Sequence, residues 1–491
     1  MSRLNLRLLP KLDGHIRQPQ YKPSEHQCGI VHIGIGAFHR GHQAVFTDDV
    51  LARFGGDWRI IGVSLRSPAV ALQLNPQDGL YSVTQKSATE QSTRIIGAIK
   101  EVLVAPKETQ KVIKTLAQQS VHIVTLTVTE KGYHYDASKG ALNNNSIDIQ
   151  HDIAHPDSLR SMPGFLVAAC KQRMLSHGQK LTVISCDNLS ENGQVCQQVV
   201  MDLAKQIDPK VASWIKHNVA FCSSMVDRIV PAITDDLRHK FVQQHGFADE
   251  GMILTEPFAQ WVIENNFCTP RPQWEEVGVI LVNKVADFEK MKLRTLNGSH
   301  SMLAYSGAVL GYEWIHQAVN DPLLRKLVLR QMRNEMQVTI PVPAGFNMQA
   351  YQNAIIARFT NEAIPYGTHQ VAMDGSLKVI PRLLLPAIEL LEKQQLPSMI
   401  LVSLACWLRY LQGVDEAGKC YDIHDPQSEL LQNLAKKYQD DPKALVNAIC
   451  CETSIFPRQI KENSAFLQRL TDNLSKITQL GLLGFLKTLK N

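Results

Sequence analysis

The stretch CGIVHIGIGAFHRGHQ (28–43) decides the fold of the first half of the chain. An apolar run rich in β-branched residues ends in Gly34-x-Gly36, and helical spacing follows it. Two glycines at a strand-to-helix turn allow the backbone to approach the pyrophosphate of a dinucleotide. His39 stands where the third glycine of the dinucleotide fingerprint is expected. Taken alone, the motif therefore leaves an ordinary strand-to-helix turn equally open.

Similar apolar runs recur along the first half of the chain and predict a parallel sheet. Stretches with helical spacing, such as 44–54 and 108–120, separate these runs, which is typical of strands joined by crossover helices. We expect an α/β fold class with an N-terminal Rossmann-type parallel-sheet domain over residues 1–285. The predicted strands are 28–36, 58–65, 92–99, 121–128, 181–188 and 277–282.

Beyond about residue 285 the strand signals end and long helical patterns take over. A chain of 491 residues is too long for one hydrophobic core, so a second domain is expected. We predict a mostly α-helical C-terminal domain over residues 286–491. The predicted helices, with apolar residues three and four positions apart, include 300–319, 322–337, 385–395, 398–412 and 465–489.

Composition excludes several classes of partner. Lys and Arg exceed Asp and Glu by only 51 to 46, which predicts neither a nucleic-acid groove nor a basic membrane face. The ten cysteines form no C-x-x-C pair, so we expect reduced thiols and no metal site. Neither a secretory signal nor an apolar run of about eighteen residues is found, which predicts a cytoplasmic location. We expect a small-molecule partner, and no heptad seam indicates a coiled-coil oligomer.

The segment FEKMKLRTLNGSHSMLAY (288–305) contains the most informative polar group. On an α-helix, Glu289, Lys292, Asn297 and His300 project to one side within an arc of roughly 140°. A solvated polar face is the ordinary explanation of such a pattern. The apolar residues around the group indicate instead a largely buried helix, in which polar groups must find partners or serve chemistry.

These side chains suit the transfer of a proton beside a carbinol or keto carbon. A lysine can act as a base when burial lowers its pKa, an asparagine N–H can donate to a developing alkoxide, and a histidine can hold a hydroxyl. A second amide, Asn188, follows the apolar run LTVI and is expected at the carboxyl end of a strand, where open α/β sheets bind ligands. An ordinary turn around Asn192-Gly193 also explains that segment.

The end of the second predicted strand bears on the choice of cofactor. Where NAD-binding folds usually place an acidic residue, the chain reads Ser64-Leu65-Arg66-Ser67. Arg66 could accept the 2′-phosphate of NADP, or it could be one more solvated arginine. The residues alone leave both interpretations open.

Together these segments resemble the polyol-specific long-chain dehydrogenase/reductase family, which includes mannitol dehydrogenases and fructuronate reductases. In this family the third fingerprint glycine is also replaced. The resemblance implies an NAD-dependent, metal-independent oxidoreductase with its active site between a Rossmann-type domain and a mostly helical domain. The helical domain is then expected to carry the substrate and the catalytic groups. Since members of this family are often monomers, we also expect a monomer or weak oligomer. The matching segments are HIGIGAFHRGHQ (32–43), TVTEKGY (127–133), SCDNLSENG (185–193), MVDRIVP (225–231), EPFAQWVIE (256–264) and KLRTLNGSHS (292–301).

Roles for individual residues follow from this resemblance. It implies that Lys292 is the catalytic acid/base, that Asn188 and Asn297 form the oxyanion site, and that His300 orients the substrate. Further positions match the surroundings of the family's active site with less defined roles: Glu130, Asp227, Glu289 and Lys378. The cofactor-binding residues are then Gly34, Gly36, Ala37 and Phe38, with Arg66 beside them; NAD is the expected cofactor, and NADP stays open.

Within the family, the segments 369–382 and 406–426 are most similar to the fructuronate reductase (D-mannonate oxidoreductase) branch. Mannitol dehydrogenases typically carry an arginine where this chain has Gln370. The branch implies interconversion of D-mannonate and D-fructuronate, and Lys378 followed by Arg382 are our candidates for holding the substrate carboxylate. The alternative is a polyol 2-dehydrogenase acting on mannitol or arabinitol.

Overall fold

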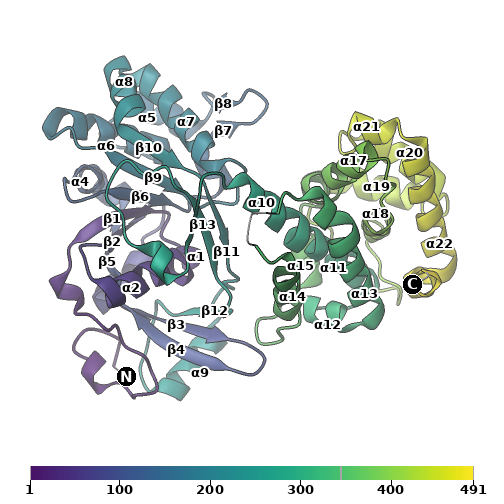
Figure 1. Ribbon diagram of the computed structural model, residues 1–491, viewed down its shortest axis with the longest axis horizontal. Coiled ribbons are helices and arrows are strands. Elements are labelled where there is room, and N and C mark those ends of the chain that lie inside the picture. Colours follow the sequence, from purple (N-terminus) through teal and green to yellow (C-terminus); the bar gives the residue numbers. More distant parts are fainter. Residues whose placement is uncertain (1, 343–345, 490–491) are drawn as a thin grey trace. The chain divides into compact units, whose positions relative to one another are not determined.

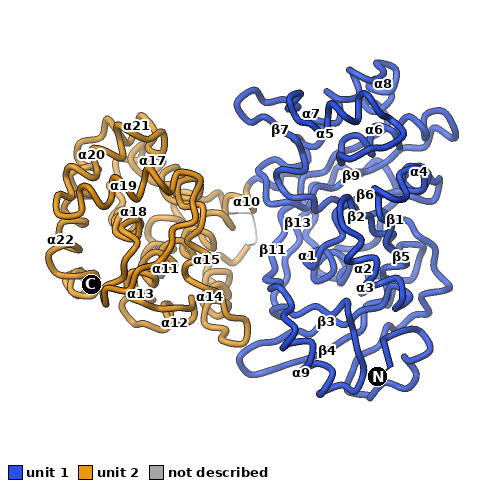
Figure 2. Tube along the Cα trace, turned by 180° about the vertical axis from the view of Figure 1, so that it is seen from behind, with its two compact units in different colours: residues 1–286 blue, residues 287–491 orange. Residues whose placement is uncertain are grey.

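The computed structural model describes residues 2–342 and 346–489, which divide into two compact units. Unit 1 comprises Met1–Ala286 and unit 2 comprises Asp287–Asn491 (Figure 2). Each unit has its own arrangement of elements and is described by itself.

The centre of unit 1 is a six-stranded sheet in the order β10-β9-β6-β1-β2-β5, in which every neighbouring pair is parallel (Figure 1). This confirms the predicted Rossmann-type α/β sheet. Its strands are β1 (Cys28–Ile33), β2 (Arg59–Ser64), β5 (Ile99–Val104), β6 (Ile123–Leu126), β9 (Leu181–Ser185) and β10 (Val219–Cys222).

Helices cover both faces of this sheet because successive side chains of each strand point to opposite sides. In β1, Val31 and Ile33 pack into one apolar core, whereas Ile30 packs into the other. The first core contains α4 (Ala105–Leu116), α6 (Met162–Ser176), α7 (Asn192–Ile207) and α8 (Pro209–Asn218). The second contains α2 (Gln43–Phe54).

Two of the predicted strands do not belong to the large sheet. The prediction at 92–99 corresponds to β4 (Gln91–Ile96), which pairs antiparallel with β3 (Tyr81–Lys86) in a sheet completed by β12 (Ile253–Thr255). The prediction at 277–282 corresponds to β14 (Ile280–Val282), in a sheet with β13 (Gln260–Glu264) and β11 (Ser224–Asp227). Smaller elements of unit 1 are β7 (Tyr135–Asp136), β8 (Ala141–Leu142), α3 (Ala69–Leu74), α5 (Ile147–Ala154) and α9 (Asp235–His245).

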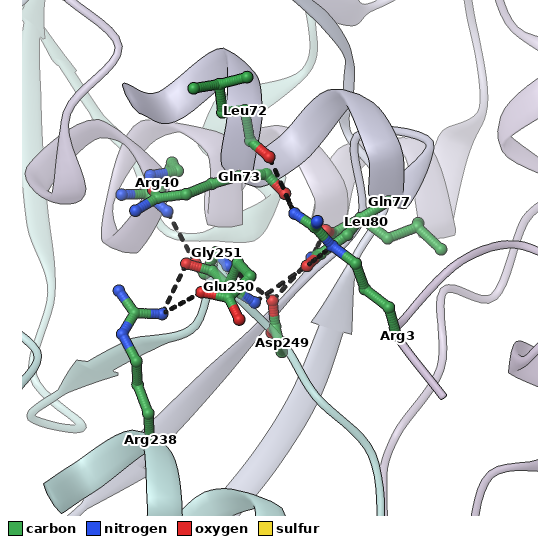
Figure 3. Close-up of polar contacts among 10 residues, drawn as sticks. All are labelled: Arg3, Arg40, Leu72, Gln73, Gln77, Leu80, Arg238, Asp249, Glu250 and Gly251. Atoms are coloured by element: carbon green, nitrogen blue, oxygen red, sulfur yellow. Dashed lines mark hydrogen bonds and ion pairs between the residues drawn. The ribbon is translucent and has the colours of Figure 1, made fainter. Parts of the chain in front are cut away.

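A polar network ties the first residues of the chain to α1 (Ala37–Gly41), the helix that follows the glycine turn (Figure 3). Arg3 Nε donates to Gln77 Oε1 at 3.0 Å, and Gln77 Nε2 donates to the buried carboxylate of Asp249 at 2.7 Å. Two residues further on, the carbonyl of Gly251 accepts from Arg40 of α1 at 2.7 Å. Through these bonds the N-terminal segment is connected to the helix that follows the glycine turn.

Unit 2 is helical, as predicted. At its centre α11 packs against α15 and α18, and α18 packs against α22. No helix within the described ranges is long and apolar enough to cross a membrane. The helices are α10 (Ala286–Lys292), α11 (Gly298–Val309), α12 (Ile315–Asn320), α13 (Pro322–Arg330), α14 (Met348–Phe359), α15 (Thr368–Ala372), α16 (Gly375–Val379), α17 (Leu385–Glu392), α18 (Met399–Tyr410), α19 (Ser428–Lys437), α20 (Pro442–Glu452), α21 (Arg458–Lys461) and α22 (Ser464–Thr488).

Candidate functional site

The glycine turn after β1 has the shape that a phosphate-binding loop needs. Gly34 has φ +94°, and a Cβ there would lie 2.1 Å from the carbonyl oxygen of Thr127, so no other residue fits. At Gly36, which precedes Ala37 and Phe38 of α1, the nearest atom to an added Cβ is 3.7 Å away. The backbone at Gly36 is therefore open to the close approach of a phosphate group.

His39 replaces the third glycine by forming a buried ring pair. Its imidazole stacks on that of His32 in β1, with ring centroids 3.4 Å apart and an interplanar angle of 13°. The two ring nitrogens of His32 lie 2.8 Å from the hydroxyls of Thr125 and Thr127. Burial lowers the pKa of His32 to about 3 and the pKa of His39 well below its ordinary value. Helix and strand thus pack through two neutral imidazoles.

Because both imidazoles of this pair are buried and neutral, we expect mild acid to destabilise unit 1. The unfolded chain binds protons at histidine below about pH 6.5 while the folded chain does not, so stability is lost as the pH falls. Between about pH 6.5 and pH 5 each buried imidazole should cost about 2 kcal/mol of unfolding free energy. Denaturant titrations across this range measure the loss. His39→Phe should reduce it by about half, whereas replacing the exposed His15 by Gln should leave it unchanged.

At the carboxyl edge of the large sheet, one carboxylate joins the ends of β6 and β9. Asp187 accepts from the backbone N–H of Val128 at 3.1 Å and of Thr129 at 2.8 Å, and from the hydroxyl of Tyr133 at 2.7 Å. It holds Thr129 at φ +66°, a region that β-branched residues avoid. Asp187 thereby fixes the turn that carries Glu130.

The site residues predicted in unit 1 lie at or beyond strand ends. Gly34, Glu130 and Asn188 follow β1, β6 and β9, which are neighbours in the sheet, so the three share its carboxyl edge. Asn188 and Glu130 are exposed. Asp227 is buried at the end of β11 in a different sheet, and Arg66 is exposed beyond the end of β2.

The predicted polar helix of unit 2 is not one continuous α-helix. Between α10 and α11 lies a π-helical turn, η6 (Leu293–Asn297), closed by the N–H of Gly298 donating to the carbonyl of Leu293. This corrects the α-helical spacing assumed above. Because a π turn joins residues five apart, Lys292 and Asn297 stand one turn from each other. Such turns frequently occur at functional sites.

The polar side chains are the accessible part of a buried helix. Of the twelve residues of α11, all of them described, His300 alone is not buried. Glu289, Lys292 and Asn297 are likewise half-buried beside buried neighbours. The ring of His300 stacks on Phe359 at 4.8 Å and meets Tyr366 edge-on at 5.7 Å. The helix is therefore largely buried, and a solvated polar face, the ordinary explanation of such a pattern, does not apply.

Ion pairs hold the π turn against α17. Arg294 donates to both carboxylate oxygens of Glu389, at 2.7 and 2.6 Å, and to the carbonyl of Thr339 at 2.6 Å. Lys290 lies 3.0 Å from the same carboxylate. These cations, Arg294 first, lower the pKa of Glu389 to about 2. The carboxylate therefore keeps its charge at every physiological pH.

Two further cations lie near the π turn. Arg382 donates to Ser301 Oγ at 3.0 Å and to the carbonyl of Asn297 at 3.4 Å, and Lys378 Nζ donates to the carbonyl of Val371 at 3.4 Å. Among the described residues, no carboxylate lies at ion-pairing distance from either cation. Burial, and then the charge of Arg382, lowers the pKa of Lys378. Residues 2–342 and 346–489 contain no cluster of three or more His, Cys, Asp or Glu placed to hold a metal.

Comparison with known proteins places this arrangement in a family. The sequence model of the mannitol dehydrogenase Rossmann domain matches residues 28–276, and that of the mannitol dehydrogenase C-terminal domain matches residues 284–478. The chain belongs to the mannitol dehydrogenase family. It is an oxidoreductase, and the predicted resemblance is confirmed.

Relatives within the mannitol dehydrogenase family differ in their substrates. D-mannonate oxidoreductase of Escherichia coli is 39% identical over 95% of this chain and 96% of that protein. Mannitol 2-dehydrogenase of Aspergillus fumigatus is 36% identical over 93% of this chain and 91% of that protein. The structure of Pseudomonas fluorescens mannitol 2-dehydrogenase in ternary complex with NAD and D-mannitol is 34% identical, with a TM-score of 0.86 over 99% of both chains.

Proposed function

We propose that this member of the mannitol dehydrogenase family interconverts D-mannonate and D-fructuronate with NAD. The observation that supports an acidic substrate is a pair of neighbouring cations, Arg382, which is bonded to the π turn, and Lys378. Among the described residues, neither has a carboxylate partner. A buried or half-buried cation without a counter-ion favours an anionic ligand. The similarity to the Escherichia coli D-mannonate oxidoreductase supports the same substrate.

We propose a role for the polar residues Lys292, Asn297 and His300, which lie at the end of α10, in the π turn and in α11. In the reductive direction, NADH supplies a hydride to the keto carbon of the substrate. The side-chain N–H of Asn297 donates to the keto oxygen, where negative charge develops. Lys292 then gives its proton to that oxygen, and the half-buried ring of His300 orients the substrate hydroxyls. Asn188, at the carboxyl edge of the sheet of unit 1, is proposed as a further amide donor to the substrate.

NAD rather than NADP is the proposed cofactor. The Gly34-x-Gly36 turn has an open backbone for a pyrophosphate, and the Pseudomonas fluorescens relative has NAD bound. We expect kcat/KM to be at least about tenfold higher with NADH than with NADPH, a difference of about 1.4 kcal/mol. Arg66→Ala should leave the NADH kinetics within about twofold, because NAD has no 2′-phosphate to meet this exposed side chain. A preference for NADPH that Arg66→Ala abolishes would reverse the assignment.

A neutral polyol is the second candidate substrate. The Pseudomonas fluorescens relative was solved with D-mannitol, and the Aspergillus fumigatus relative is a mannitol 2-dehydrogenase. A panel of D-fructuronate, D-fructose and D-xylulose, followed by NADH oxidation, tests the proposal. Fructuronate should react best, and oxidation of NADH with none of the three would contradict the whole assignment. The cytoplasmic location and the monomeric or weakly oligomeric state stay predictions.

A further inference from the structure

Unit 1 has a pocket at the edge of the large sheet opposite the glycine turn. Its volume is about 920 Å³, within the range of small-molecule sites. The parallel strands β1, β2 and β5 start here, whereas the Gly34-x-Gly36 turn follows the other end of β1. The pocket is therefore separate from every residue assigned above. Its lining includes Cys28, Arg59, Lys100, Lys114, Thr115 and Ser120.

A buried arginine stands at this pocket without a counter-ion. Arg59, the first residue of β2, is only 6% exposed. Its terminal nitrogens donate to the carbonyls of Pro23 at 3.0 Å and Ile99 at 2.9 Å, while its Nε has no hydrogen-bond partner. No carboxylate within the described ranges forms an ion pair with it. Burial lowers the pKa of this guanidinium, which shows how poorly water reaches the charge.

Two lysines add unpaired charge to the same pocket. Lys100 at the start of β5 and Lys114 in the last turn of α4 are exposed, and neither has an ion-pair partner among the described residues. A third lysine of the lining, Lys111, is already paired with Glu101 at 3.2 Å. The other acidic group, Asp78, accepts the backbone N–H of Leu6 at 3.0 Å. Among the described residues, the pocket lining thus has three cations without an ion-pair partner. Only one of its carboxylates, Asp78, is outside an ion pair.

A multiply charged anion is the ligand that this arrangement fits. A desolvated guanidinium is costly without a partner, and phosphate oxygens meet both its charge and its hydrogen-bond geometry. The hydroxyls of Thr115 and Ser120 offer further donors. We propose that this pocket is a second ligand site that binds a phosphorylated small molecule with two or more negative charges. The volume accommodates an organic group attached to the phosphate.

Calorimetric titration with inorganic pyrophosphate tests the site without any turnover. The titration is run on the whole protein in saturating NADH, which blocks the glycine turn, and it is repeated with inorganic phosphate. One molecule of pyrophosphate should bind, and more tightly than phosphate, because it carries more charge. Lys100→Glu/Lys114→Glu should weaken the binding by at least about tenfold, because two attractive charges become repulsive.

The matched control makes the same change in net charge elsewhere on unit 1. Lys107→Glu/Lys180→Glu alters two exposed lysines outside the pocket lining and should change the affinity by less than about twofold. Equal weakening in both double variants, or no binding by the unaltered protein, would overturn the proposal. NADH oxidation with D-fructuronate, in the absence of phosphate and pyrophosphate, should be unchanged in both double variants, so a failure here is distinct from a failure of the proposed function.

Discussion

Replacement of Lys292 by Ala is expected to lower kcat by about two to four orders of magnitude, the usual contribution of a general acid or base. The half-buried side chain stands at the end of α10, one π turn before Asn297. Steady-state NADH oxidation measures the loss. Binding of NADH, followed by fluorescence titration, should be retained, because the glycine turn is part of unit 1.

Lys290→Ala is the matched control for this experiment. It removes a lysine two residues earlier in the same helix, whose ion pair with Glu389 should contribute only about 0–1 kcal/mol. Its kcat should therefore stay close to that of the unaltered protein. Near-normal turnover in Lys292→Ala would remove the assignment of this lysine. Activity lost with EDTA and restored by zinc would contradict a metal-independent mechanism.

The sequence predicted four of the six strands of the large sheet, because these strands are buried on both faces, but it did not predict β10. The runs at 28–36, 58–65, 121–128 and 181–188 each contain one strand of the sheet. The run at 92–99 was wrongly predicted to be one strand of the large sheet, because two strands follow one another there: β4 ends at Ile96 and β5 begins at Ile99. Both are apolar and β-branched, so periodicity does not reveal that only the second joins the parallel sheet.

Candidate site residues can be named from the sequence and stay predictions, whereas their geometry cannot be read from it. Spacing alone gave no sign of the π turn, in which Arg294 is bound by Glu389 of α17, a contact distant in the sequence. Tyr133 was not identified either, although the segment 127–133 contains it, because its bond to Asp187 crosses between two strands. His39 weakens the glycine motif only when the motif is taken alone, and the stacking of His39 on His32 is the structural reason for the missing glycine. Long-range contacts of this kind leave no local pattern.

The charge of the substrate decides between the two candidate functions, and Lys378 is the residue through which to test it. Among the residues that the structure describes, its half-buried ammonium has only a long hydrogen bond, to the carbonyl of Val371. A substrate carboxylate bound beside it would therefore give this ammonium a counter-ion. D-mannonate should therefore be oxidised with a far higher kcat/KM than D-mannitol. Lys378→Gln should cost about 2–5 kcal/mol in kcat/KM for mannonate, the scale for breaking a desolvated charge pair.

The same substitution should leave the oxidation of mannitol nearly unchanged, because a neutral polyol has no charge for Lys378 to meet. This difference separates a role in binding the carboxylate from a general loss of structure, which lowers both activities together. Lys476→Gln, in an exposed lysine of α22, controls for the loss of one positive charge and should affect neither substrate. Arg382 is less suited to the test, because it also forms hydrogen bonds to Asn297 in the π turn and to Ser301 in α11. Equal kcat/KM values for mannonate and mannitol in the unaltered enzyme would assign the chain to the polyol branch and leave the proposed roles of Lys292, Asn297 and His300 as they stand.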